Sequence, residues 1–213
     1  MAQNSESLVS IPVDDVELEG TLAIPEDAAG LVVFAHGSGS SRKSPRNNFV
    51  AEVIREQGLG TLLFDLLTER EDQFRENRFD ISLLTDRLVA VTEWVWSRED
   101  TRDLNVGYFG SSTGAASALR AAARLEDDID AVVSRGGRVD MASEVLDEVQ
   151  APTLFVVGGA DTQVLELNRD AYDQLSCEKD LYVVEGAGHL FEGEGELDEV
   201  AHVAADWFAD ALQ

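Results

Sequence analysis

A serine lies at the centre of a glycine-framed segment, residues 110–114 (GSSTG), which has the spacing G-x-S-x-G. The alternating apolar segment 104–108 precedes it and an alanine-rich stretch follows, as expected of a buried strand and a helix. A strand-to-helix turn this sharp exposes its central residue at the strand tip, so Ser112 is the candidate nucleophile. The Thr113 amide, at the start of the helix, would then point toward the oxyanion that nucleophilic attack on a carbonyl creates.

Two residues further along the chain can activate this serine, and they occur in the order serine, acid, histidine that such a turn requires. Asp161 follows an apolar strand and a Gly-Gly turn, and His189 follows the last predicted strand. His189 would accept the serine proton and return it to the leaving group, while Asp161 would hold the imidazole tautomer. The Ser38 amide, just after another strand end, would supply a second oxyanion donor beside Thr113.

Each of these assignments leaves an alternative open. Ser111 is adjacent to the proposed nucleophile and competes with it. Asp161 has the alternative role of capping the helix that follows it, with Asp140 as the other candidate acid. His36 is expected to support its own loop more than to catalyse, and His202 lies off the apolar stripe of the terminal helix, where solvent would surround it.

Strands alternate with helices along the chain, which predicts a mostly parallel twisted sheet of about seven or eight strands with helices on both faces. The predicted strands are residues 8–13, 16–24, 31–35, 59–67, 104–108, 129–134, 153–157 and 181–184. The predicted helices are residues 45–57, 81–96, the segment after the serine turn, 141–149, 164–175 and 197–212. Residues 68–80 are expected to form a charged loop with one helical turn, too short for a lid domain.

Length and composition favour a single α/β domain over residues 1–213, with 44% apolar residues. The first residues lack the basic and apolar regions of a secretory signal, and no apolar run approaches the roughly 18 residues that span a membrane. Cys177 is the only cysteine, so an intrachain disulfide is impossible. It also lies too far from any strand end to be the nucleophile. We expect a cytoplasmic protein in a reducing compartment.

The net charge of −26, from 42 acidic and 16 basic residues, is extreme for this length. Such a chain repels nucleic acids and anionic membranes, so neither is an expected partner. Only two of the basic residues are lysines. Excess acid with few lysines is typical of proteins from salt-accumulating cytoplasms, where salt screens the self-repulsion. The alternative is an ordinary acidic protein.

Several stretches together resemble the α/β-hydrolase superfamily over nearly the whole chain, and within it the capless dienelactone hydrolase-like group. These stretches are HGSGSSRKSPRN, GYFGSSTGAA, VVSRGGR, VVGGAD and GAGHLF. The resemblance implies an esterase acting on a small ester or lactone. No metal or organic cofactor is expected, because the three histidines show no close ligand spacing and the one cysteine stands alone. Dienelactone hydrolase itself uses a cysteine nucleophile where this chain has Ser112, which favours general esterase chemistry. The alternatives are a thioesterase or acyltransferase of the same fold, or a catalytically silent binding module. The oligomeric state is left open.

Two of the loops at the predicted site contain no acid in an otherwise acidic chain. These loops, residues 36–51 and 131–139, hold five of the 16 basic residues, namely Arg42, Lys43, Arg46, Arg135 and Arg138. We hypothesise that they form a cationic rim that binds an anionic group on the substrate, such as a carboxylate or phosphate. The alternative is that each of them pairs with an acid that the fold brings near.

Overall fold

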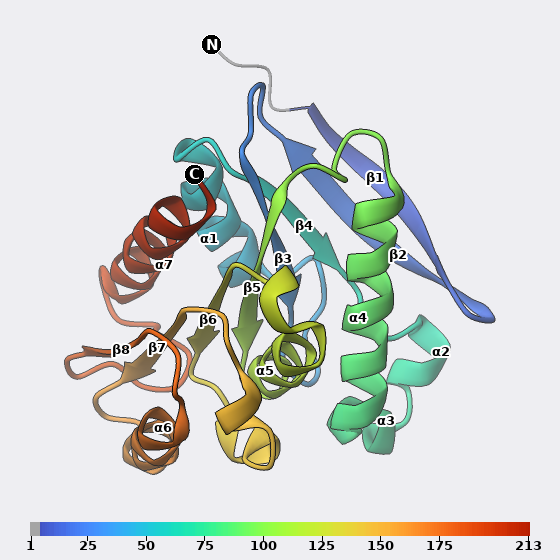
Figure 1. Cartoon of the computed structure of the whole chain (residues 1–213). Coiled ribbons are helices and arrows are strands. Elements are labelled where there is room, and N and C mark those ends of the chain that lie inside the picture. Colours follow the sequence, from blue (N-terminus) through green and yellow to red (C-terminus); the bar gives the residue numbers. More distant parts are fainter. Residues whose placement is uncertain (1–4) are drawn as a thin grey trace.

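A single eight-stranded sheet organises the computed structural model, which describes residues 5–213 (Figure 1). Its strand order is β1-β2-β4-β3-β5-β6-β7-β8, with β1, β2 and β4 paired antiparallel and all other pairs parallel. The strands are β1 (Ser5–Val13), β2 (Val16–Ile24), β3 (Gly30–Ala35), β4 (Gly60–Phe64), β5 (Asn105–Ser111), β6 (Ala131–Arg135), β7 (Thr153–Gly158) and β8 (Lys179–Val184). The predicted fold class, an α/β-hydrolase fold, is confirmed.

Helices cover both faces of this sheet. α1 (Pro45–Glu56) and α7 (Glu196–Leu212) bury one face, and α4 (Ile81–Ser97) and α5 (Thr113–Leu125) bury the other (Figure 1). The remaining elements are α2 (Glu69–Asp72), α3 (Arg75–Phe79), α6 (Thr162–Gln174) and the 3₁₀ turns η1 (Glu126–Asp128), η2 (Val139–Ala142) and η3 (Leu146–Glu148). Because both faces are covered, every residue of β3, β4 and β7 is buried, which explains their continuous apolar sequences.

Several predicted elements differ from the structure. The helix predicted over residues 141–149 was wrong: the segment forms η2 and η3, interrupted at Val145, where φ is −125°. Its apolar residues are buried at helical spacing, but so short a segment gains little from nucleating an α-helix. The strand predicted over residues 59–67 ends at Phe64. Residues 68–80 contain two short helices, α2 and α3, where one helical turn was expected.

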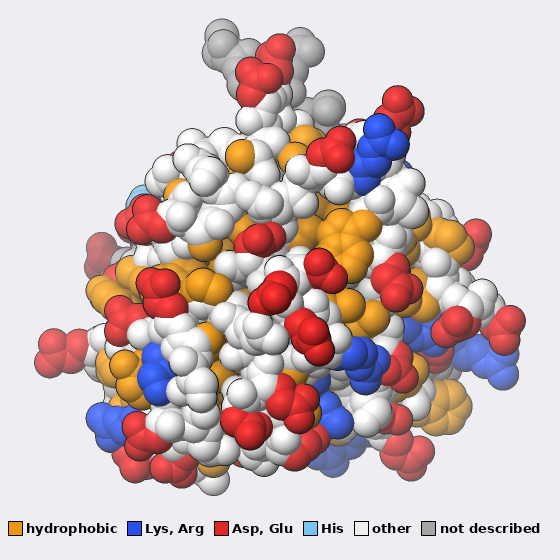
Figure 2. Space-filling view, viewed as in Figure 1, with side chains coloured by type: hydrophobic (Ala, Val, Ile, Leu, Met, Phe, Trp, Pro, Cys, Tyr) orange, Lys and Arg blue, Asp and Glu red, His pale blue; other side chains and the backbone are white. Residues whose placement is uncertain are grey.

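Acidic side chains are scattered over the face of the molecule in Figure 2, with fewer Lys and Arg side chains between them. Within residues 5–213, no helix is both long enough and apolar enough to cross a membrane.

The parallel strands determine where a site can form. The loops that follow β3, β5, β6, β7 and β8 all leave the carboxyl edge of the sheet, and these are the loops that carry the candidate residues. Ligands of open α/β sheets bind at this edge, because several strand ends and helix N-termini converge there.

Candidate active site

Ser112 occupies a strained turn between β5 and α5. Its backbone has φ 50° and ψ −118°, a combination that L-residues rarely adopt and that persists only where the surroundings impose it. Gly114 permits the turn, since a Cβ at that position would lie 2.1 Å from the carbonyl oxygen of Ala35. Backbone hydrogen bonds hold the turn from the neighbouring strand: the Ser112 N–H donates to Arg135 O at 3.1 Å, and the Arg138 N–H donates to Ser112 O at 3.0 Å.

The neighbouring Ser111 has a different environment. It is the last residue of β5 and is 3% exposed, and its hydroxyl donates to Asn47 Oδ1 at 3.3 Å. Both serines border an open cavity of about 540 Å³ at the strand ends, but Ser112 is more exposed and its hydroxyl has no such partner in the described chain. Between the two serines, the geometry therefore favours Ser112 as the nucleophile.

His189 and Asp161 lie together at the adjacent strand ends. His189 Nδ1 is 2.7 Å from Asp161 Oδ2, and His189 lines the same cavity as Ser112. The two loops can approach because Gly158 has no side chain: a Cβ there would lie 2.3 Å from Ala187 O. The Ala160 N–H also donates to Ala187 O at 2.9 Å, which ties the loops together.

The alternatives to these residues have other partners. Asp161 occupies the N-cap position of α6 but makes no capping hydrogen bond with its side chain. Asp140 instead forms a bidentate ion pair with Arg138, which lowers the pKa of the Asp140 carboxyl. His202 is exposed on α7 beside Asp198, and Cys177 lies near Thr153, away from the cavity.

The two residues whose amides are proposed as oxyanion donors, Ser38 and Thr113, are joined by a hydrogen bond. The Ser38 N–H donates to Thr113 Oγ1 at 2.9 Å, so this donor is already occupied by a neutral hydroxyl. Thr113 is the first residue of α5, where the amides have no acceptor within the helix. Sequence analysis placed the Ser38 and Thr113 amides side by side, but it could not show that the Thr113 hydroxyl occupies the Ser38 amide, because this hydrogen bond joins residues 75 positions apart. An oxyanion at this place would compete with the Thr113 hydroxyl for the Ser38 amide.

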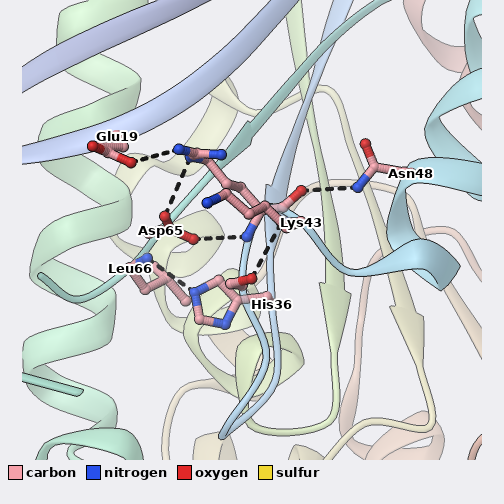
Figure 3. A network of polar contacts seen from close by, with 8 residues as sticks. Glu19, His36, Lys43, Asn48, Asp65 and Leu66 are labelled. Atoms are coloured by element: carbon pink, nitrogen blue, oxygen red, sulfur yellow. Dashed lines mark hydrogen bonds and ion pairs between the residues drawn. The ribbon is translucent and has the colours of Figure 1, made fainter. Parts of the chain in front are cut away.

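His36 supports the loop that carries Ser38. Its Nε2 accepts the Leu66 N–H at 3.0 Å (Figure 3), and its Nδ1 lies 2.9 Å from Gly37 O. Because Nε2 accepts, the ring proton belongs on Nδ1, and the ring bridges β3 to the segment after β4 as a neutral imidazole. Burial lowers the pKa of His36 below its ordinary value of 6.5, although Gly37 O and the charge of Asp65 partly oppose that change.

We therefore expect His36 to make the fold sensitive to mild acid. The unfolded chain takes up a proton at His36 near pH 6.5, whereas the folded chain resists it, so stability falls as the pH drops below about 6.5. Denaturant unfolding at pH 7.5 and pH 5.5 should show a smaller loss of stability for His36→Asn than for the wild type. His202→Gln is the control: its pKa is raised in the fold, so removing it should not reduce the loss. An equal loss in wild type and His36→Asn would contradict this role.

Three residues of the cavity wall are basic: Lys43, Arg46 and Arg135. Arg42 and Arg138 were grouped with them in the predicted cationic rim, but their side chains do not line this cavity in the described chain. Arg42 pairs with Glu19 and Asp65 (Figure 3), and Arg138 pairs with Asp140. For these two arginines, the structure shows the ion pairing that the sequence left as the alternative.

Within residues 5–213, no cluster of three or more His, Cys, Asp or Glu side chains is placed to hold a metal ion. The groups that gather at the cavity are a hydroxyl, an imidazole with its carboxylate, and guanidinium and ammonium groups. This set is suited to acyl transfer through a nucleophile and a general base.

Comparison with known proteins gives a consistent picture of the fold. The profile of the dienelactone hydrolase family matches residues 18–213. A solved structure of dienelactone hydrolase from Anabaena variabilis is 51% identical and superposes with a TM-score of 0.97, covering 99% of this chain and 100% of the other. Est1E from Butyrivibrio proteoclasticus has a TM-score of 0.81 at 17% identity, covering 96% and 98% of the two chains, and shares the fold.

One curated relative has a different kind of name. A protein of Mycobacterium tuberculosis (strain H37Rv), provisionally named a phosphoribosyl transferase, is 53% identical over 204 residues. The match covers 96% of this chain but 46% of the relative, so this chain spans about half the length of the curated relatives it matches.

Proposed function

The chain belongs to the dienelactone hydrolase family, and from that premise we propose that it is a serine hydrolase that cleaves a small carboxylic ester or lactone. The observation that carries the proposal is the His189–Asp161 contact of 2.7 Å beside the strained Ser112 turn, in one cavity. Family membership alone would not establish an activity, because one fold hosts many functions. The site geometry supports this one.

In the proposed reaction, the Ser112 hydroxyl attacks the ester carbonyl carbon while His189 Nε2 takes its proton. Asp161 accepts the Nδ1–H of His189, which leaves Nε2 free as the base and stabilises the imidazolium that forms. The Thr113 amide, with the Ser38 amide once Thr113 Oγ1 releases it, holds the oxyanion. Imidazolium then protonates the leaving alcohol, and water hydrolyses the acyl-enzyme by the same route in reverse.

The name of the mycobacterial relative does not conflict with this proposal. That protein is about twice as long as the matched segment, since the match covers 46% of it. We attribute the named phosphoribosyl transfer to the portion outside the match, because the matched portion is the part that resembles this chain. A thioesterase or acyltransferase remains the alternative with the same chemistry, since it differs only in the leaving group or acceptor.

Covalent labelling tests the nucleophile directly. A fluorophosphonate probe in molar salt, chosen because the sequence predicts a salt-adapted protein, should label the wild type. Labelling should be lost in Ser112→Ala and retained in Ser111→Ala, the matched control one residue away. Labelling that persists in Ser112→Ala and disappears in Ser111→Ala would show that Ser111 is the nucleophile and contradict the proposal. A folded wild type that does not label would favour a binding module over an enzyme.

A further inference from the structure

The cavity beside Ser112 has what we call the basic wall, formed by Lys43, Arg46 and Arg135. Among the described residues that line this cavity, none is Asp or Glu, although the chain contains 42 acids. A neighbouring hollow between β2 and α2, which Lys43 also lines, has the opposite character, with Glu17 and Glu69 among its five acids. Acidic side chains are therefore absent from the described lining of the cavity, although Asp161 contacts His189 of that lining, and they are frequent on the surface beside it.

Arg135 is the residue of this wall whose charge is buried without a hydrogen-bond or ion-pair partner in the described chain. Its Nη1 atom is buried and has no hydrogen-bond acceptor in the described chain, and no described carboxylate lies within 4.0 Å of the side chain. Its guanidinium lies 5.9 Å from the Phe109 ring centroid. Burial, together with the charge of Arg46, lowers the pKa of Arg135 to about 10, so the group is still cationic at neutral pH. A buried charge without a counter-ion is costly, and an anion in the cavity would reduce that cost.

Arg46 and Lys43 add charge at the rim. Arg46 is paired with Glu192 at 2.7 Å, but Glu192 is 68% exposed, and exposed ion pairs of this kind contribute little. Lys43 is exposed and belongs to no described ion pair. Glu192 offsets part of the charge of Arg46, and Lys43 also borders the five acids of the neighbouring hollow, so the unpaired charge of the wall is concentrated at Arg135.

The N-terminus of α1 faces the same space. Ser44 caps the helix through its hydroxyl, Pro45 occupies the first turn, and both line the cavity. The first turn contains no acid, so nothing on it offsets the partial positive charge of the helix end. A helix N-terminus alone is weak evidence, but here it adds to Arg135, which lines the same cavity and has an unpartnered guanidinium nitrogen.

We propose that the basic wall binds a phosphate group on the substrate, so that the enzyme acts on a phosphorylated ester or lactone. A carboxylate carries one charge and is satisfied by one arginine fork. A phosphate monoester carries about −1.5 to −2 charges and three strong acceptor oxygens, which matches donors that converge from three basic side chains and the N-terminus of α1. This inference rests on the proposed function for the reaction, and on the basic wall for the phosphate.

The overall charge of −26 does not prevent this binding. At physiological ionic strength, charges farther apart than about 8 Å are largely screened, so a phosphate within the cavity interacts mainly with the basic wall.

Direct binding is the first test, since it does not depend on activity. Calorimetric titration with inorganic phosphate, against acetate as the monoanion and with sodium chloride holding ionic strength constant, should detect binding of phosphate and much weaker binding of acetate. Arg135→Met should weaken phosphate binding at least tenfold, because a hydrogen bond to a charged group is lost. Arg124→Gln removes the same charge from the far end of α5, where Arg124 pairs with Asp86, and should bind like the wild type.

Two exposed variants keep the test valid if Arg135→Met fails to fold. Lys43→Gln and Arg46→Gln should each weaken phosphate binding several-fold, whereas Glu192→Gln, which releases Arg46, should strengthen it. Equal affinity for acetate and phosphate, or wall variants that bind phosphate like the wild type, would overturn the inference while leaving probe labelling at Ser112 intact. Loss of labelling with phosphate binding preserved would instead overturn the proposed hydrolase.

Discussion

Replacing His189 with Gln should reduce kcat for a small activated ester by about 10⁶-fold, the scale seen when a catalytic histidine is removed from a serine hydrolase. His189 is the histidine that lines the cavity with Ser112, and its Nδ1 contact with Asp161 orients Nε2 as the base. Without it, the Ser112 hydroxyl has no acceptor for its proton at the moment of attack. KM should change much less, because the other residues that line the cavity and bind the substrate are unchanged.

A matched control separates catalysis from general effects of losing a histidine. His202→Gln changes an exposed histidine on α7 and should keep wild-type kcat. Unfolding measurements on both variants would establish that each is folded, which we expect since His189 is partly exposed. If His189→Gln retained more than about a hundredth of the wild-type kcat, a residue other than His189 would have to act as the base, because general base catalysis alone contributes 10²–10⁴-fold.

Much of the fold could be predicted because its signals are local. Continuous apolar segments such as residues 31–35 and 153–157 indicate strands buried on both faces, and both segments are strands in the structure. The turn at Ser112 was equally accessible, since the G-x-S-x-G spacing lies within five consecutive residues between an apolar segment and a helix. The segment 141–149 failed because burial at helical spacing does not distinguish a short α-helix from successive 3₁₀ turns.

The pairing of Arg42 and Arg46 could not be predicted, because it depends on contacts between distant parts of the chain, whereas Arg138 pairs with Asp140 only two residues away. Arg42 meets Asp65, 23 residues away, and Arg46 meets Glu192, 146 residues away. The sequence therefore presented five equivalent basic residues in two acid-free loops. Tertiary packing distinguishes them, because it neutralises Arg42 and Arg138 outside the cavity and leaves Arg135 within it without an acceptor.

Replacing Asp161 with Asn should lower kcat by about 10⁴-fold with little change in KM. The carboxylate accepts the Nδ1–H of His189, whereas an Asn side chain can present its amide N–H there instead. His189 would then accept at Nδ1 and carry its proton on Nε2, which is the tautomer that cannot take a proton from Ser112. The loss thus comes from the wrong tautomer in an otherwise intact site.

Asp140→Asn distinguishes this role from that of the other candidate acid. Asp140 pairs with Arg138, and neither side chain lines the cavity, so the variant should keep kcat near the wild-type value. Asp161→Asn should also unfold at nearly the wild-type temperature, because the Asp161 side chain makes no capping hydrogen bond to α6. A larger kcat loss in Asp140→Asn than in Asp161→Asn would transfer the orienting role to Asp140. If Asp161→Asn were instead largely unfolded under the conditions of the assay, its low activity would come from lost structure, and Asp161 would be a structural residue. A wrong tautomer changes the rate and leaves the fold intact.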